Sequence, residues 1–293
     1  MSQLFPIGVV AEQTGVPAPT LRAWERRYGV PVPQRTASGR RVYTPADIQQ
    51  VVRLKRLSES GVPPSVGALS LGLAVPTQAD ETDHGAHTEA VSSILGAIDQ
   101  YDPSLLEAEL RRVMHLTSPL SFFRGVMVPV MSCLSQRWPN DSNLTIAQEH
   151  LTTEIFRLVA QDLHRLSRPA QPAYTCIVAC STDEVHVLPL YAIAFWLAAR
   201  NVRSIVLGAR TPPTAVAEAV KALRPDFVAL SATVVPTKNV VDGMLSDYHS
   251  ACAGVPWVIG GLATGQMGSA IRAAGGQIIE QLDDLNDFLA TLG

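Results

Sequence analysis

Long uncharged apolar runs are absent from this 293-residue sequence. A transmembrane helix needs about 20 consecutive apolar residues, and no run free of charge reaches that length. The N-terminus, MSQLFPIGVVAEQ, also lacks the charged start and apolar centre of a secretory signal peptide. Together these absences predict a cytoplasmic protein.

Cysteines and charged residues are both scarce. The four cysteines, Cys133, Cys176, Cys180 and Cys252, show no metal-binding spacing, and two of them fall in a predicted buried strand. We therefore expect small reduced thiols, which excludes a disulfide-stapled secreted domain. Charged residues make up 17% of the chain and apolar residues 47%, which is enough for the cores of two or three domains.

The charges that are present are unevenly distributed. The chain carries a net charge of −3, but residues 1–72 hold nine Lys and Arg against four acids, a balance of +5. The remainder carries −8. A basic first quarter on an acidic body is typical of a nucleic-acid-binding module attached to another domain.

The basic quarter contains two short helical patterns followed by a hairpin pattern. Gly15 ends the first helix, Pro17 and Pro19 form the turn, and Thr20 is expected to cap a second helix. Gly39 permits a tight hairpin with arginines at its tip. The segment LRAWERRYGVPVPQRTASGRRVYTPADI closely resembles the winged helix-turn-helix of MerR-type regulators. The resemblance implies that double-stranded operator DNA is contacted by Arg22, Arg26, Arg27, Arg40, Arg41 and Tyr43.

A predicted linker, residues 73–88, separates this head from an all-helical segment, residues 89–167. Four helical patterns joined by short loops predict a four-helix bundle. Asp102 and Ser118 are expected to cap two of the helices, and Pro129 should kink the third. On the last helix we expect a core stripe, with Glu149 and His150 beside it, formed by Leu144, Ala147, Leu151, Ile155 and Leu158.

Residues 172–293 alternate between apolar runs and helical patterns, which predicts a flavodoxin-like, doubly wound parallel sheet. Strands are expected near residues 174–180, 203–208, 227–232, 256–260 and 276–280. Helices are expected near residues 185–200, 212–223, 237–251, 264–273 and 283–291. Ligands bind such sheets outside the carboxyl ends of the strands. The side chains and backbone expected at those ends belong to His186, Ser231, Thr233, Gly260 and Gly261.

These residues also form a recognisable spacing. Glu184-x-His186-x-x-Pro189 is followed after 41 residues by Ser231-x-Thr233 and after 26 more by Gly260-Gly261. This arrangement resembles the cobalamin-binding pattern D-x-H-x-x-G…S-x-L…G-G. The resemblance implies that His186 is the lower cobalt ligand and that the nucleotide tail of the cofactor passes Ser231 and the glycines. The sequence departs from the pattern at Glu184, Thr233 and Pro189.

The order of the three predicted domains resembles the CarH/LitR group of light-sensing repressors. That resemblance implies that Trp138, Glu149 and His150 cap the upper face of adenosylcobalamin and that His150 becomes the upper cobalt ligand after light. It also implies a dark tetramer that dissociates on illumination. Ten residues separate Trp138 from Glu149, one more than expected for the group.

Two other interpretations remain open at the level of sequence. Pro189 and the longer spacing after Trp138 fit a MerR-type regulator that senses another tetrapyrrole or a partner protein. A bundle joined to a cobalamin fold also resembles the corresponding module of methyltransferases. The basic head has no role in such an enzyme, so a regulator without enzymatic activity is the favoured prediction.

Overall fold

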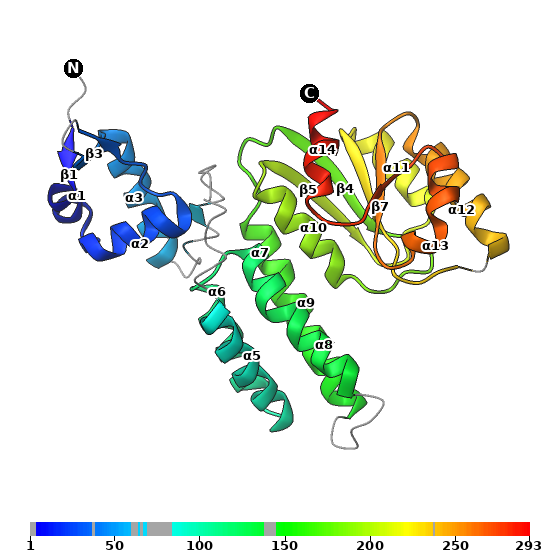
Figure 1. Cartoon of the computed structure of the whole chain (residues 1–293), viewed down its shortest axis with the longest axis horizontal. Coiled ribbons are helices and arrows are strands. Elements are labelled where there is room, and N and C mark those ends of the chain that lie inside the picture. The colour runs from blue at the N-terminus through cyan, green and yellow to red at the C-terminus, as the bar shows by residue number, and fades with distance from the viewer. Residues whose placement is uncertain are drawn as a thin grey trace. The chain divides into compact units, whose positions relative to one another are not determined.

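The computed structural model describes residues 4–36, 39–59, 64, 67–68, 84–137, 145–236 and 238–293. The chain forms two compact units, residues 1–170 and residues 171–293. Figure 1 shows helices alone in the middle of the chain and a helix-flanked sheet in the second unit. Among the described residues, no helix is both long enough and apolar enough to cross a membrane.

The N-terminal head is a helix-turn-helix with a small antiparallel sheet. Its elements are β1 (Phe5–Pro6), α1 (Ile7–Thr14), α2 (Ala18–Tyr28), β2 (Gln34–Arg35), β3 (Arg41–Tyr43) and α3 (Pro45–Glu59). The strands lie in the order β1-β3-β2. Gly15 and Gly29 end α1 and α2 with φ angles of 65°, a conformation that glycine adopts without strain. Leu21, Trp24 and Tyr28 of α2 pack into the core of the head.

Two local expectations for the head are wrong. Helix α2 begins at Ala18, and no side chain caps it, so Thr20 is not its cap. Pro19 is accommodated in the first turn of α2 because the first helical N–H groups have no intrahelical acceptor. Arg41 lies within β3, paired with Arg35, and not at the hairpin tip.

The described residues of the middle of the chain, 84–137 and 145–166, are mainly helical. The helices are α5 (His84–Asp99), α6 (Pro103–Met114), α7 (Pro119–Phe122), the π-helix η2 (Phe123–Met127), α8 (Val128–Arg137) and α9 (Ile146–Leu166). Asp102 and Ser118 cap α6 and α7, as predicted, because each side chain accepts a backbone N–H three residues on. Helix α5 begins inside the predicted linker, and His87 on it is buried, so the linker's predicted end at residue 88 is wrong.

A π-helix, η2, ends at Met127, two residues before Pro129, where the sequence predicts a kink. Proline lacks the N–H that would bond to the carbonyl four residues earlier, at Gly125. A π-turn at this position accommodates the missing bond, and α7, η2 and α8 continue as one helical segment.

The second unit is a five-stranded parallel sheet in the order β5-β4-β6-β7-β8. Its strands are β4 (Tyr174–Cys180), β5 (Val202–Gly208), β6 (Phe227–Ser231), β7 (Trp257–Gly260) and β8 (Gln277–Ile279). Its helices are α10 (Leu188–Ala198), α11 (Pro213–Leu223), α12 (Lys238–Cys252), α13 (Thr264–Ala273) and α14 (Asp284–Ala290). In sequence terms this order is 2-1-3-4-5, the doubly wound arrangement that was predicted.

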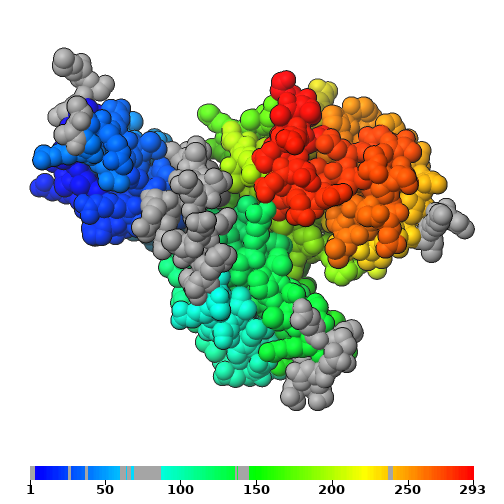
Figure 2. Space-filling model, viewed as in Figure 1, coloured from blue at the N-terminus to red at the C-terminus, as the bar shows by residue number. Residues whose placement is uncertain are grey.

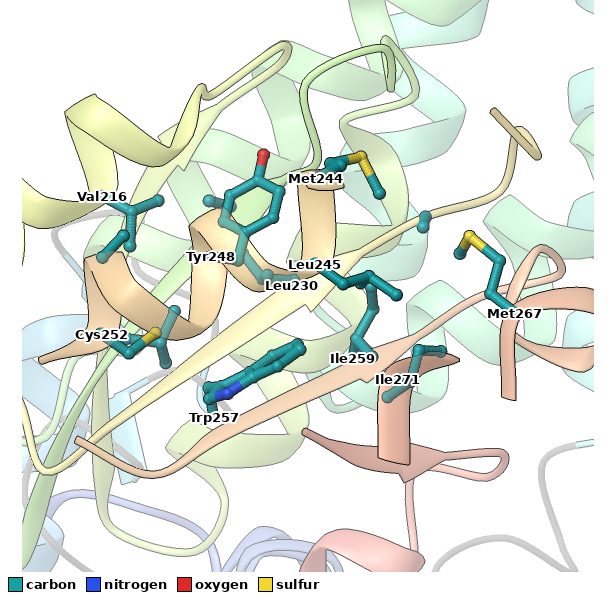
Figure 3. Packing of buried hydrophobic residues seen from close by; sticks show 14 of the residues in the cluster. Val216, Leu230, Met244, Leu245, Tyr248, Cys252, Trp257, Ile259, Met267 and Ile271 are labelled. Atoms are coloured by element: carbon teal, nitrogen blue, oxygen red, sulfur yellow. The ribbon is translucent and has the colours of Figure 1, made fainter. Parts of the chain in front are cut away.

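Helices cover both faces of the sheet. On one face, residues of α11, α12 and α13 pack on β4, β6 and β7 in a core that includes Tyr248, Trp257 and Ile271 (Figure 3). On the other face, Phe288 of α14 meets Phe227 of β6 edge to face, with ring centroids 5.2 Å apart. Trp196 of α10 donates to Asp283 beside α14. In the space-filling view, the C-terminal segment, coloured red, forms part of the surface of the second unit (Figure 2).

Candidate functional site

The predicted site residues of the second unit meet at the carboxyl edge of the sheet. Cys180, Ser231, Gly260 and Ile279 end four adjacent strands and are direct neighbours in the register. Parallel strands place their carboxyl ends at one edge, so the loops after β4, β6 and β7 converge there. Of the five residues predicted at these strand ends, Ser231, Gly260 and Gly261 line one groove, whereas its lining does not include His186 and Thr233.

Residues 181–187 form a loop between β4 and α10, and the carboxylate of Glu184 organises it. This side chain is fully buried. One oxygen, Oε1, accepts the backbone N–H of His186 at 2.7 Å and lies 2.6 Å from Nδ1 of the same residue. The other, Oε2, accepts the N–H of Val234 at 3.2 Å and both the N–H and the hydroxyl of Thr233. Helix α10 therefore begins only at Leu188, three residues later than predicted.

These hydrogen bonds determine the charge of Glu184. Burial by itself raises the pKa of a carboxyl group, because it disfavours the charged form. Here the donors from Thr233 and His186 outweigh burial and lower the pKa of Glu184 to about 2. The group is therefore an anion at neutral pH, and it accepts hydrogen bonds only.

His186 projects from this buried anion towards solvent, with 61% of its side chain exposed. Because Nδ1 faces the carboxylate, Nε2 is the ring nitrogen that is available to a metal. Within the described ranges no group of three or more His, Cys, Asp or Glu side chains could hold an ion. Cobalt in a corrin ring carries ligands of its own, so a single imidazole is a suitable protein ligand for it.

An apolar groove lies at this edge of the sheet, between the strand ends and residues of α10 and α14, and Pro189, three residues after His186, is part of its lining. It has a volume of about 190 Å³ and is lined in part by Ser231, Gly260, Gly261, Ile193 and Leu285. A Cβ atom at Gly261 would clash with the Ala232 carbonyl oxygen, and one at Gly260 would lie 3.0 Å from the Ile279 carbonyl oxygen. The two glycines therefore allow the strand-end loops to pack closely along the groove.

The loops around His186 also expose apolar side chains. Val185, Val234 and Leu262 are 45%, 43% and 87% exposed. Apolar side chains around a metal-binding imidazole can pack against the face of a large, flat ligand. The exposed nitrogen, the apolar rim and the groove together fit a cobalamin whose nucleotide tail lies in the protein.

Pro189, one of the three departures from the cobalamin pattern, lies in the first turn of α10 and lines the groove. A proline at this position removes no helical hydrogen bond. Pro189 therefore fits the start of α10 and leaves the groove open. Ile193 and Leu285, which also line it, were missed in the sequence because an apolar residue facing a groove has the same pattern as one facing a core.

In the bundle, Glu149 and His150 lie in the first turns of α9, which begins with a capping box of Thr145 and Gln148. His150 is 72% exposed, and its Nε2 lies 3.5 Å from Oε2 of Glu149. Thr153 donates to the other oxygen of that carboxylate at 3.1 Å. Trp138, the third predicted residue of the upper face, lies outside the described residues.

The core stripe predicted for α9 is partly wrong. Ile155 is buried, whereas Ala147 and Leu158 are exposed, and Leu144 lies outside the described residues. The buried face contains Gln148 and Thr152 instead. Gln148 donates to the Ile98 carbonyl at 2.8 Å, so a satisfied amide occupies a position that apolar periodicity assigns to a hydrophobic residue.

In the head, the predicted DNA-contacting residues that the structure describes differ in exposure. Arg22 and Arg40 are exposed, and Arg41 donates through Nε to both carboxylate oxygens of Glu25, at 2.9 and 3.0 Å. Tyr43 is completely buried, so it packs beneath the hairpin and does not present a surface to DNA. The side chains of Arg26 and Arg27 lie outside what the structure describes.

Fold and site together define a class: a helix-turn-helix regulator whose C-terminal sheet has the features of a corrinoid-binding domain. Comparison with known proteins agrees. Residues 5–66 match the MerR HTH family regulatory protein model, and residues 174–280 match the B12 binding domain model. In fold, the chain is similar to the monomethylamine corrinoid protein of Methanosarcina barkeri, with a TM-score of 0.55 and 12% identity, over 71% of this chain and 100% of that one.

Relatives that match most of this chain in sequence identify the family within this class. The chain is 34% identical to the HTH-type transcriptional repressor CarH of Myxococcus xanthus over 269 residues, which cover 88% of this chain and 89% of that protein. It is 29% identical to the repressor CarA of the same organism, over 95% of this chain and 94% of that one. The chain belongs to this CarH family of B12-domain transcriptional repressors.

Proposed function

We propose that the protein is a light-responsive, DNA-binding repressor that uses adenosylcobalamin as its chromophore. The observation that carries the proposal is the geometry of His186, an exposed imidazole whose Nδ1 faces a buried carboxylate, in a loop that leads into Pro189, a lining residue of the apolar groove. A neutral imidazole with a free Nε2 is a good ligand for cobalt. The head and the family supply the link to transcription.

Each part of the chain has a role in the proposal. His186 would bind cobalt from below, and the groove lined by Ser231, Gly260 and Gly261 would hold the nucleotide tail. Glu184 would fix the His186 tautomer, with Thr233 beside it. Trp138, Glu149 and His150 would cover the upper side, and His150 would bind cobalt after illumination. Adenosylcobalamin, when bound, supplies a cobalt–carbon bond that light can cleave.

The regulatory output would come from assembly on DNA. In the proposal, the dark form is a homotetramer, and light converts it into smaller species. Linked heads bind a double-stranded operator more tightly than single heads because each bound head raises the effective concentration of the next. Inverting a two-state equilibrium from 1:99 to 99:1 takes about 5.5 kcal/mol of bias. In the proposal, a new bond between His150 and the metal would be the source of this bias.

The test is gel filtration of the full chain with adenosylcobalamin, monitored at protein and corrin wavelengths, in the dark and after green light. We expect co-eluting colour in the dark and a smaller species after light. His186→Ala should lose most of the bound colour. His150→Ala should bind in the dark but give a less stable lit form. His115→Ala, which changes an exposed histidine of α6's C-terminal end, is the matched control.

Absence of co-eluting colour from the parent protein would overturn the cobalamin assignment and favour a regulator that senses another tetrapyrrole or a partner. Binding without any light-dependent change of size would retain the cofactor and exclude the proposed light response. Equal spectra for the parent, His186→Ala and His150→Ala would exclude both histidines as ligands.

A further inference from the structure

The carboxylate of Glu184 connects the loops that follow two neighbouring strands, and its two oxygens serve different partners. Oε1 faces the backbone N–H and the ring of His186, after β4. Oε2 faces the N–H and hydroxyl of Thr233 and the N–H of Val234, after β6. Rotating the carboxylate away from Thr233 would therefore also move the oxygen that holds the histidine.

The hydroxyl of Thr233 lies close to both the Glu184 carboxylate and the His186 ring. It contacts Oε2 of Glu184 and is also 3.2 Å from Nδ1 of His186. The backbone N–H of residue 233 would donate to Glu184 whatever side chain stood there. The hydroxyl is the part of the contact that depends on the identity of the residue, and serine is the other small residue that could supply it.

The same contact relates two departures from the cobalamin pattern. Glu184 stands where the pattern has aspartate, and Thr233 stands where it has leucine. A glutamate is one methylene longer than an aspartate, and here the extended carboxylate reaches the loop after β6. The two unusual residues touch one another, so they behave as one coupled change rather than as two independent losses of the site.

We propose that Thr233 is a positioning residue for His186: its hydroxyl holds the Glu184 carboxylate in the rotamer that accepts Nδ1–H, which keeps Nε2 unprotonated and directed outward. This role deepens the proposed function and rests on it where cofactor binding is concerned. Thr233 thus acts through Glu184 and is not a lining residue of the groove. Ser231, two residues earlier, does line the groove.

The first test needs no cofactor. The nitrogen chemical shifts of His186 in the ligand-free, full-length protein, measured at a pH where the ring is neutral, report which nitrogen carries the proton. We expect the Nδ1–H form in the parent and in Thr233→Ser, and a mixture of tautomers in Thr233→Val. Thr214→Val, which changes an exposed threonine of α11, should match the parent.

The second test is equilibrium binding of adenosylcobalamin in the dark. Removing a partner of a metal-binding histidine typically weakens metal affinity about 10- to 100-fold. We expect a loss of that order for Thr233→Val and near-parental affinity for Thr233→Ser. In a double-mutant cycle, Glu184→Asp and Thr233→Val together should lose less than the product of their separate losses, because both break the same contact.

The outcomes separate the inference from the function on which it rests. Parental tautomer and affinity in Thr233→Val, or equal losses in Thr233→Ser and Thr233→Val, would overturn the role of the hydroxyl. If the parent binds no cobalamin, the proposed function fails, and the tautomer measurement still decides the inference. If Thr233→Val loses its native circular dichroism, Thr233→Ala replaces it in both tests.

Discussion

Gly261 lies just after β7, with a φ of 113°, a conformation that side-chain-bearing residues rarely adopt. An added Cβ would also collide with the Ala232 carbonyl oxygen. Gly261→Ala should therefore destabilise the sheet unit by about 1–3 kcal/mol. Hydrogen exchange of peptides from β6 and β7 measures this locally, without requiring two-state unfolding of the whole chain.

Gly265→Ala is the matched control for this substitution. Gly265 is an exposed residue of α13, and an added Cβ would have no atom within 4 Å. Alanine in a helix is favoured over glycine by up to about 1 kcal/mol, so exchange should be unchanged or slower. Equal exchange in Gly261→Ala and the parent would show that the strand-end loop relaxes freely around a side chain.

The ionisation of Glu184 predicts a pH dependence. The pKa of Glu184 in the folded protein is about 2, against 4.5 for an ordinary glutamate. The ionised form of Glu184 is therefore favoured more strongly in the folded than in the unfolded state. The resulting stability is fully present above pH 4.5 and is lost as the pH falls towards 2. The shift corresponds to a contribution on the order of 3 kcal/mol.

Hydrogen exchange of peptides from β4 and β6 at several pH values between 7 and 3 tests this expectation. Protection of both strands should fall in the acid range after correction for the intrinsic exchange rate. Glu184→Gln, which has no carboxyl group to titrate, should show a flatter profile and lower protection at neutral pH. A profile as steep as that of the parent would assign the acid sensitivity to other groups.

At the scale of elements, the bundle depends on a close contact between α5 and η2. An added Cβ at Gly125 would lie 2.3 Å from Nδ1 of buried His87. Gly125→Ala should destabilise the bundle by about 1–3 kcal/mol, the usual effect of overpacking a core. Exchange of peptides from α5 measures it, and Gly96→Ala, on α5 with open space around it, is the control.

If the collision is with His87, then His87→Ala should reduce the effect of Gly125→Ala in the double variant. Additive effects would instead place the strain in the π-helix itself. His87 was not foreseen as a packing residue because the tract before it is small, polar and acidic, and a buried partner at Gly125 leaves no local signal in the sequence.

The sequence patterns predict the order of elements well, because strand runs and helical caps such as Asp102 and Ser118 are local signals. They also place Ser231 and Gly260 at one sheet edge, because all strands of a doubly wound sheet point the same way. They do not predict which donor meets which acceptor. The contact of Thr233 with Glu184 and that of Gln148 with Ile98 join residues 49 and 50 positions apart, so tertiary structure decides them.

At the scale of the whole molecule, the charge is unevenly distributed, so that the head attracts DNA and the rest of the chain repels it. The head, with its balance of +5, would approach the operator, while the remaining −8 favours contact through the head alone. Each phosphate contact releases counterions, so the logarithm of the binding constant falls with the logarithm of salt concentration, by about 0.9 per contact. The slope of this salt dependence therefore measures the number of phosphate contacts between protein and DNA.

The proposed light response predicts that this slope differs between the two states. A dark tetramer places more heads on the operator than a smaller lit species, so its slope should be steeper and its affinity at fixed salt higher. Measuring operator binding at several salt concentrations, with adenosylcobalamin in the dark and after green light, gives both values. Arg22→Ala should reduce each slope, by about one for every head engaged if the side chain contacts phosphate.

Arg111→Ala, an exposed arginine of α6, is the control and should leave both slopes unchanged. The ratio of the losses that Arg22→Ala causes in the dark and in the light gives the ratio of engaged heads. Equal slopes in both states, with an affinity that still falls on illumination, would contradict release through disassembly. In that case light would change how each head contacts the operator DNA, and the proposed link between assembly and repression would be wrong.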